Sequence, residues 1–144
     1  MFINGTLVVY MNTYNWYSQL LKPSWAPPSW LFGPVWSVLY VIIAFSFGTI
    51  FYKVFTKEIP IIVALPFALN LLFNIAFTPI QFGLKNNLFA SVDIILILAT
   101  LIWALFVVFR LSPNLHWITY VNLPYLLWVM FATVLQLSIT FLNA

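Results

Sequence analysis

The sequence contains very few charged residues and no cysteine. Five Lys or Arg and two Asp or Glu occur among 144 residues, so charged residues make up 5% of the chain. A soluble domain has about 25% charged residues, and this chain therefore lacks the side chains needed to cover a water-facing surface. The absence of cysteine excludes disulfides, thiolate metal sites and thiol redox chemistry.

Groups that bind metals or nucleic acid are equally scarce. His116 is the single histidine, and Glu58 and Asp93 are the only acids. These are too few ligands for zinc or haem iron, so we expect no metal and no cofactor. The formal net charge is +3, but the basic residues are spread along the chain rather than gathered in a patch. Nucleic acid is therefore not an expected partner.

Long apolar runs take the place of charge. Hydrophobic residues make up 65% of the chain, and the mean hydropathy is +1.08. A helix needs about 20 apolar residues to cross a bilayer, whereas β-barrel strands would alternate over about 10 residues. The charged residues separate four continuous runs, which we predict to be antiparallel membrane helices because their connections are short. They span about 29–52 (apolar over 31–52), 59–81, 87–109 and 115–141.

The N-terminal region, about residues 2–20, is open to two interpretations. It is apolar at first and then polar and aromatic, and Tyr10, Tyr14 and Tyr17 are spaced to share one helical face. It is equally compatible with a short transmembrane helix and with an interfacial belt of aromatic residues. No basic segment precedes the apolar stretch and no small-residue cleavage site follows it, so we do not interpret it as a cleaved signal peptide.

A segment rich in proline and tryptophan leads into the first long run. Proline fixes φ and removes a backbone donor, which makes the segment stiff, and tryptophan favours the membrane–water boundary. We expect this segment to form a lid over a flat ligand at one end of the bundle. Its central residues are Trp25, Pro27, Pro28 and Trp30.

Three of the predicted helices carry a stripe of aromatic or amide residues. Amides are costly against lipid, so the polar stripes should face the bundle interior. Together they would form a pocket with aromatic walls, as expected for a large, flat, mostly apolar ligand. The alternative is that the amides only link helices, each bond being worth about 1 kcal/mol, and for a single amide we favour that alternative. The stripes are Gly33, Trp36, Tyr40 and Phe47; Asn70, Asn74, Phe77 and Gln81; and Tyr125, Trp128, Ala132 and Gln136.

Two titratable residues have ordinary structural explanations. Asp93 lies inside a predicted membrane helix, which makes it a functional candidate. It also lies within the first two turns, where the helix dipole favours negative charge, and we favour this structural reading. His116 begins the last run beside Trp117 and is expected at the membrane interface rather than as an axial haem ligand.

The order of several motifs resembles the TspO/MBR family, the tryptophan-rich sensory proteins of bacteria and the mitochondrial translocator protein, formerly the peripheral benzodiazepine receptor. The matching motifs cover about residues 14–143. They are Trp16-Tyr17, Lys22-Pro23-Ser24-Trp25-Ala26-Pro27-Pro28, Phe32-Gly33-Pro34-Val35-Trp36 through Tyr40, Leu69-Asn70 and Asn74, Phe82-Gly83-Leu84, Val92-Asp93, and Pro124-Tyr125-Leu126-Leu127-Trp128 through Phe131-Ala132-Thr133.

The resemblance implies one all-helical membrane domain over residues 1–144, a bundle of five transmembrane helices that is commonly a homodimer. The first helix, at about 2–20, is apparently truncated, because 15 residues precede Trp16. The resemblance also implies a pocket under the first loop that binds porphyrins and synthetic benzodiazepine-site ligands. By position, its lining would be Tyr17, Trp36, Asn70, Asn74, Phe77, Gln81, Trp128 and Ala132. The Tyr and Lys/Arg pattern of cholesterol-binding members is missing from residues 134–141, which counts against steroid recognition.

The leading functional hypothesis is an integral membrane receptor, in a bacterial inner membrane, that senses or carries protoporphyrin-type tetrapyrroles. Its partners would be a porphyrin or other flat apolar ligand, the lipid bilayer and a second copy of the chain. The alternative is an enzyme for light-dependent oxidative degradation of protoporphyrin, in which Trp36 and Trp128 would be electron donors. A small transporter of another class is disfavoured, because the sequence shows no intramembrane ion pairs and no inverted repeat.

Overall fold

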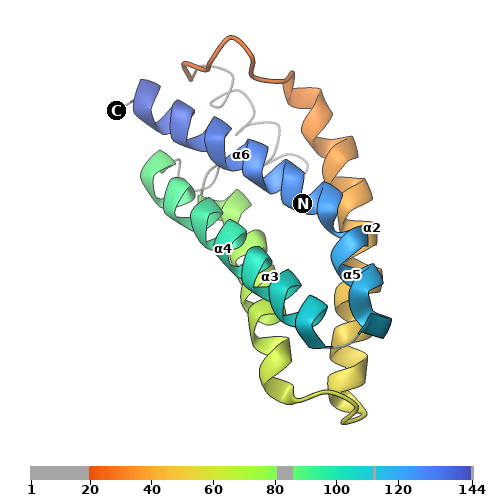
Figure 1. The fold of residues 1–144 in the computed structure, drawn as a ribbon. Helices are drawn as coiled ribbons and strands as arrows, with labels where there is room; N and C mark the ends of the chain where they lie inside the picture. Colours follow the sequence, from red (N-terminus) through yellow and green to blue (C-terminus); the bar gives the residue numbers. More distant parts are fainter. Residues whose placement is uncertain (1–19, 81–85, 112, 144) are drawn as a thin grey trace.

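A computed structural model describes residues 20–80, 86–111 and 113–143, and every regular element within them is helical. The predicted all-helical membrane bundle is thereby confirmed, whereas the helix predicted at 2–20 lies outside the described residues. Figure 1 shows the elements in chain order. They are the 3₁₀ turn η1 (Ser29–Leu31), α2 (Phe32–Phe55), η2 (Ile61–Val63), α3 (Ala64–Thr78), α4 (Asn87–Leu111), η4 (Pro113–Leu115), α5 (His116–Val121) and α6 (Leu123–Leu142).

Among the described helices, three are long and apolar enough to cross a membrane. They are α2, α4 and α6, with 24, 25 and 20 residues. The shorter α3 has 15 residues, or about 22 Å at 1.5 Å per residue. It is shorter than the predicted run because its entry is the extended Pro60 followed by η2. At the other end Pro79 lacks the N–H that would continue the α-helical hydrogen bonds.

The last predicted run, 115–141, consists of two helices rather than one. The division falls at Asn122, between α5 and α6. Pro124 is the second residue of α6, and its ring would clash with the carbonyl of Tyr120 in a continuous helix. The Asn122 side chain braces the break, because its Nδ2 donates to the carbonyl of Ile118 at 2.8 Å and to Ser46 Oγ on α2 at 2.9 Å.

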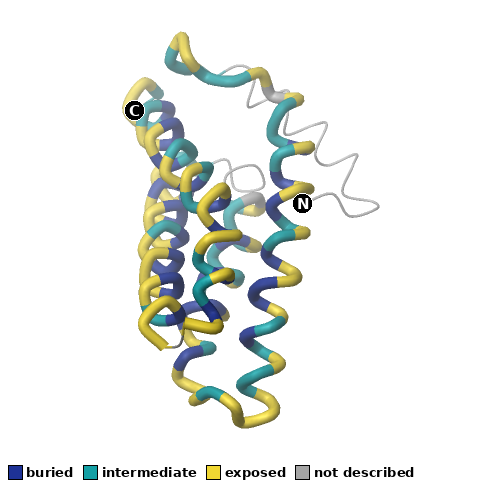
Figure 2. The backbone as a smooth tube through the Cα atoms, turned by 45° about the vertical axis from the view of Figure 1, so that its right-hand side comes forward, coloured by how far each residue is buried: buried dark blue, intermediate teal, exposed yellow. Residues whose placement is uncertain are grey.

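The helices bury their facing sides and expose apolar side chains outward. α4 packs along both α3 and α6, while α2 approaches α3, η2 and α5. Figure 2 shows the buried positions on the sides that face one another and the exposed positions on the outer sides. The outer side chains include Phe45, Phe55 and Phe141, each more than 70% exposed. An apolar outer surface is what lipid requires, and the chain is therefore an integral membrane protein.

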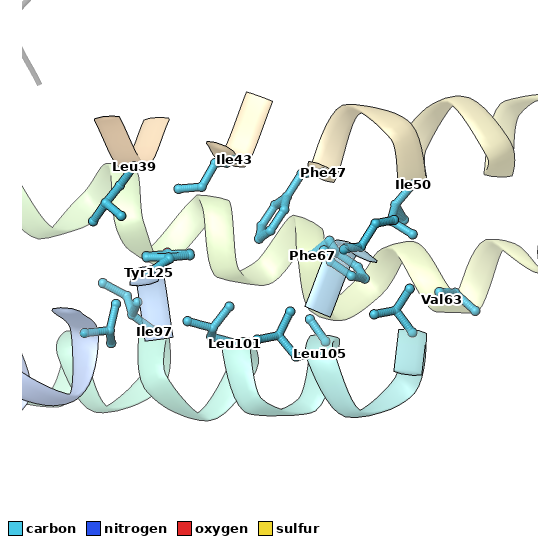
Figure 3. Packing of buried hydrophobic residues seen from close by; sticks show 14 of the residues in the cluster. Leu39, Ile43, Phe47, Ile50, Val63, Phe67, Ile97, Leu101, Leu105 and Tyr125 are labelled. Carbon is cyan, nitrogen blue, oxygen red and sulfur yellow. The ribbon is translucent and has the colours of Figure 1, made fainter. Parts of the chain in front are cut away.

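The apolar core lies between α2, α3 and α4 and includes one tyrosine from α6. Phe47 of α2 meets Phe67 of α3 edge to face, with ring centroids 4.8 Å apart. Tyr125 of α6 is fully buried among them. Figure 3 shows this packing. The labelled residues are Leu39, Ile43, Phe47, Ile50, Val63, Phe67, Ile97, Leu101, Leu105 and Tyr125.

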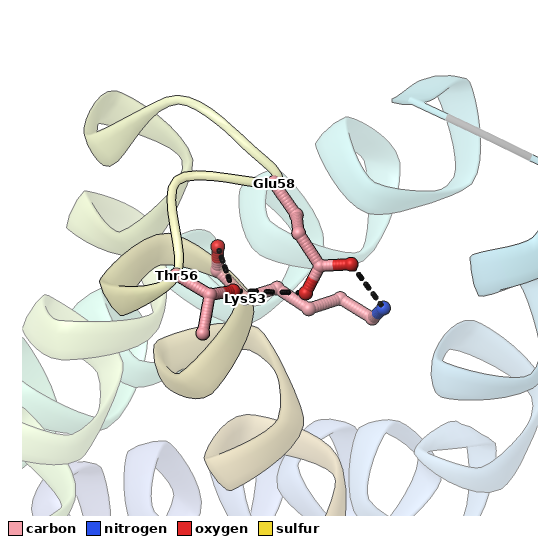
Figure 4. A network of polar contacts seen from close by, with 3 residues as sticks. All are labelled: Lys53, Thr56 and Glu58. Carbon is pink, nitrogen blue, oxygen red and sulfur yellow. Dashed lines mark hydrogen bonds and ion pairs between the residues drawn. The ribbon is translucent and has the colours of Figure 1, made fainter.

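The loop after α2 forms the end of the bundle opposite the proline-rich segment. Glu58 lies 3.8 Å from the Lys53 ammonium and accepts a hydrogen bond from Thr56 Oγ1 at 2.8 Å (Figure 4). Lys57 has a φ of 63°, which turns the chain back toward η2. Because the Lys53–Glu58 pair is well exposed, it adds little stability, and the contacts mainly shape the turn.

Candidate ligand-binding site

Six aromatic and amide residues from three helices are buried or half-buried in the interior, and we call them the aromatic–amide cluster. Four of them are almost completely buried, with Trp36 8% and Asn74 6% exposed and both Asn70 and Tyr125 at 0%. The other two are half-buried. The cluster consists of Trp36 and Tyr40 from α2, Asn70 and Asn74 from α3, and Tyr125 and Trp128 from α6.

A continuous chain of hydrogen bonds runs through the cluster. The Tyr40 hydroxyl donates to Asn74 Oδ1 at 3.2 Å, and Asn74 Nδ2 donates to the Tyr125 hydroxyl at 2.9 Å. The Tyr125 hydroxyl in turn donates to Asn70 Oδ1 at 2.8 Å. Asn70 Nδ2 ends the chain on α4, where it donates to the carbonyl of Ile97 at 2.9 Å and to Thr100 Oγ1 at 3.2 Å. These hydrogen bonds therefore link α2, α3, α4 and α6.

The two amides lie in the interior, as their spacing predicted, but their situations differ. Asn70 accepts from the Tyr125 hydroxyl through its carbonyl oxygen and donates through Nδ2 to the Ile97 carbonyl and to Thr100 Oγ1. It therefore acts as a link between helices, the alternative that the sequence left open. Asn74 donates one N–H to Tyr125, and among the described residues no group accepts the other.

The aromatic rings form two groups, one around each tryptophan. Trp36 lies against Tyr40, with ring centroids 5.5 Å apart, and meets Tyr125 edge-on at 6.4 Å. Trp128 contacts Phe32 of α2 at 5.8 Å and Phe131 at 5.5 Å. The Trp128 Nε1 atom is buried, and no hydrogen-bond partner lies near it in the described part of the chain. A buried donor without an acceptor is costly, so this N–H suits an acceptor carried by a ligand.

The proline-rich segment lies across the end of α6 and reaches this second ring group (Figure 1). Trp25 packs edge-on against Phe131, with centroids 5.7 Å apart. Leu21 and Asn143 exchange two hydrogen bonds, from Leu21 N to Asn143 Oδ1 at 3.1 Å and from Asn143 Nδ2 to the Leu21 carbonyl at 2.9 Å. Trp30 is 69% exposed, so Trp25 is the tryptophan of this segment that approaches the cluster.

Comparison with known proteins agrees with this arrangement of motifs and helices. The model of the TspO/MBR family matches residues 1–142. The chain belongs to the TspO/MBR family. Similar proteins include the tryptophan-rich protein TspO of Bacillus cereus, which is 38% identical over 128 residues that cover 89% of this chain and 80% of that protein. Protein CrtK of Rhodobacter capsulatus is 33% identical over 89% of this chain and 78% of its own length. The human translocator protein is 31% identical over 92% of this chain and 77% of its own length.

The remaining predicted site residues of this TspO/MBR protein are distributed as follows. Phe77 and Ala132 are partly buried and pack against the main core. Pro27 is half-buried and Pro28 exposed in the loop. Tyr17 and Gln81 lie outside the described residues. For all of these residues, a contact with a ligand stays a prediction.

The two titratable candidates outside the cluster have different surroundings. Asp93 is 5% exposed, and its Oδ2 has no hydrogen-bond partner among the described residues. His116 stacks on Phe109 with ring centroids 4.0 Å apart, and its Nε2 lies 3.0 Å from the Phe109 carbonyl oxygen. The imidazole of His116 is thus held by its neighbour at the end of α4.

Two tyrosines of the cluster were not among the predicted site residues of this TspO/MBR protein. Tyr40 and Tyr125 belong to the sequence stripes, whose spacing predicts aromatic walls rather than polar contacts from these two residues. A phenol at membrane depth needs a hydrogen-bond partner. An amide stripe on a neighbouring helix indicates that such partners are present, but it does not show which phenol meets which amide.

Proposed function

We propose that this TspO/MBR protein is a receptor that binds protoporphyrin-type tetrapyrroles, and synthetic benzodiazepine-site ligands, against the aromatic–amide cluster, and that it senses or carries them. Family membership supports a membrane receptor or sensor role. The observation that carries the finer proposal is the combination of two tryptophan ring groups with a buried indole N–H, at Trp128, that has no hydrogen-bond partner among residues 20–80, 86–111 and 113–143.

The binding energy would come mainly from the rings. A tetrapyrrole is flat and mostly apolar, so it would bury its faces against Trp36 and Trp128. Each aromatic pair is worth about 0.5–1.5 kcal/mol beyond the area that it buries. The amide and phenol groups would orient the ring rather than hold it. Trp25, through Phe131, would close the site from the loop side.

A homodimer is part of the proposal, because the family resemblance implies one. Apolar side chains cover the outer faces of α2, α4 and α6, and lipid or a second copy of the chain would satisfy them equally well. Native mass spectrometry from detergent micelles measures this directly. A spectrum containing monomer alone would contradict the dimer without affecting the binding proposal.

Light-dependent degradation of protoporphyrin is the second candidate function. One observation favours it: two oxidisable indole rings, Trp36 and Trp128, each belong to one of the ring groups of the proposed site. In this scheme the photoexcited porphyrin takes an electron from the indole and passes it to dioxygen, which becomes superoxide. The indole radical cation then takes an electron back from the porphyrin, which restores the tryptophan, and the oxidised porphyrin combines with superoxide. Neither a metal nor an acid–base pair is required.

One titration separates these functions. Purified protein is titrated with protoporphyrin IX in the dark while tryptophan fluorescence is followed, and the complex is then illuminated while its absorption spectrum is recorded. Saturable quenching without bleaching supports the receptor, and bleaching faster than that of free porphyrin supports the enzyme. Trp103→Ala is the matched control, because Trp103 is 41% exposed on α4 and belongs to neither ring group. Absence of saturable quenching in the wild type would refute porphyrin binding.

A further inference from the structure

The hydrogen-bond chain through the cluster has a fixed direction, and a single carbonyl sets it. The carbonyl oxygen of Ile97 has no proton and can only accept. Asn70 therefore turns its Nδ2 toward Ile97, at 2.9 Å, and its Oδ1 toward Tyr125. An amide oxygen also only accepts, so the Tyr125 hydroxyl must donate its single proton to Asn70.

The same logic fixes the next two groups. Because the Tyr125 hydroxyl proton is already donated to Asn70, the Tyr125 oxygen can only accept from Asn74. Asn74 therefore turns its Nδ2 toward Tyr125, at 2.9 Å. Asn74 Oδ1 then faces Tyr40, whose hydroxyl donates to it at 3.2 Å. The Ile97 carbonyl on α4 therefore determines, through Asn70 and Tyr125, which side of the Asn74 amide donates and which side accepts.

This polarity decides what the cluster offers to a ligand. Asn74 retains one N–H bond that no described residue accepts, and it lies beside the half-buried Tyr40, whose ring contacts Trp36. The Trp128 Nε1–H is a second buried donor without a partner in the described part of the chain. Within the described part of the cluster, the two N–H groups without an acceptor are thus donors that would pair with an acceptor on the ligand.

We infer that Tyr125 is a positioning residue that fixes the orientation of the Asn74 amide, with one N–H left for a ligand, and that the site thereby selects tetrapyrroles that present a carboxylate or carbonyl oxygen. The inference rests on the proposed porphyrin site and deepens it. Without the Tyr125 hydroxyl, the Asn74 amide loses its fixed orientation. Rotation by about 180° about its terminal side-chain bond exchanges its donor and acceptor sides. Tyr125 would act entirely through Asn74 and need not touch the ligand.

The test compares two porphyrins that share the same ring. Protoporphyrin IX carries two carboxylates, whereas etioporphyrin carries alkyl groups only. We expect Tyr125→Phe to weaken protoporphyrin IX binding about tenfold, the ratio associated with one good hydrogen bond, and to change etioporphyrin binding less than about twofold. Tyr52→Phe is the matched control, because it removes the hydroxyl of a tyrosine that is 65% exposed on α2.

A double-mutant cycle separates positioning from mere stability. If Tyr125 acts through Asn74, Tyr125→Phe causes no further loss of protoporphyrin IX binding in an Asn74→Ala background. Equal weakening of both porphyrins, or additive losses in the double variant, would overturn the inference while leaving porphyrin binding intact. If the wild type binds neither porphyrin, the proposed function fails and the inference fails with it.

A measurement on the wild type covers the case in which Tyr125→Phe does not fold. Protein labelled with ¹⁵N at asparagine is titrated in micelles, and the side-chain NH₂ signals of Asn74 are assigned by their absence from Asn74→Ala. We expect these signals to move with protoporphyrin IX and to stay in place with etioporphyrin. Signals that respond identically to both porphyrins, or to neither although both bind, would contradict the selection of an acceptor.

Discussion

The hydrogen-bond clamp between Leu21 and Asn143 provides the most direct test of the lid. Asn143 follows the last turn of α6, and its amide pairs with the backbone of Leu21 as a neighbouring strand would, by one donated and one accepted bond. A further bond to the Ile139 carbonyl, at 2.8 Å, fixes the side chain on its own helix. Asn143→Ala removes the clamp and leaves the Trp25–Phe131 contact as the remaining aromatic tie.

The expected size of the effect follows from where these bonds lie. Both are exposed to solvent, so each should contribute about 0.5–1 kcal/mol, the lower half of the net range of a hydrogen bond. The pair then holds the loop by about 1–2 kcal/mol, which corresponds to about a 5–30-fold change in the equilibrium between closed and open loop. The helices themselves should be unaffected, because the deleted contacts lie outside their core.

Hydrogen exchange measures this opening without any ligand. The Leu21 N–H is held by Asn143 Oδ1 at 3.1 Å, so its exchange should accelerate about 5–30-fold in Asn143→Ala, by the factor worked out above. Mass spectrometry of a peptide covering residues 20–28 reports the rate. Ser138→Ala is the matched control, since Ser138 Oγ bonds only within α6, to the Val134 carbonyl. Equal exchange of the two variants would refute the clamp. Faster porphyrin association and dissociation at similar affinity would connect the clamp to ligand entry.

Three further predictions concern the site and the helix break. Trp36→Ala and Trp128→Ala should each weaken protoporphyrin IX quenching about tenfold or more, because stacking and the buried ring area are both lost; wild-type affinity in both folded variants would remove these residues from the site. Trp36→Phe and Trp128→Phe should retain most binding and lose most light-dependent bleaching, if the wild type bleaches at all; bleaching at the wild-type rate would exclude indole chemistry. Asn122→Ala should lower the free energy of unfolding in detergent by about 1 kcal/mol, because its bond to Ser46 is lost. Adding Ser46→Ala should lower it little further. Additive losses would show that the two side chains are not coupled.

The positions of the long helices were predictable because apolar runs interrupted by charge follow directly from the cost of burying charge in lipid. The predicted runs 29–52 and 87–109 correspond to α2 and α4 within a few residues. The run 115–141 was wrong as a single helix. Pro124 was visible in the sequence, but proline is tolerated near a helix start and disruptive inside one. Asn122, with its bonds to Ser46 and Ile118, makes that point a start.

The site was predictable only in part. Spacing put Asn70 and Asn74 on one face of a helix, and both are buried. Spacing could not show that the Tyr125 hydroxyl would lie between them, because that depends on how α6 is placed against α3. Nor could it show that Trp25 would pack on Phe131 or that Leu21 would meet Asn143, since these partners are far apart in the chain.

The sequence by itself determined the solvent, the helical class and the family. Composition and motif order are properties of the chain alone, and so few charges leave lipid as the only surroundings for the apolar runs. The tertiary structure decided which polar groups are already paired and which remain available. Asn70 is hydrogen-bonded to a neighbouring helix, whereas one N–H of Asn74 and the Nε1–H of Trp128 have no acceptor among the described residues. Hydrogen bonding depends on distance and direction between helices, and neither is written in the spacing of residues along one helix.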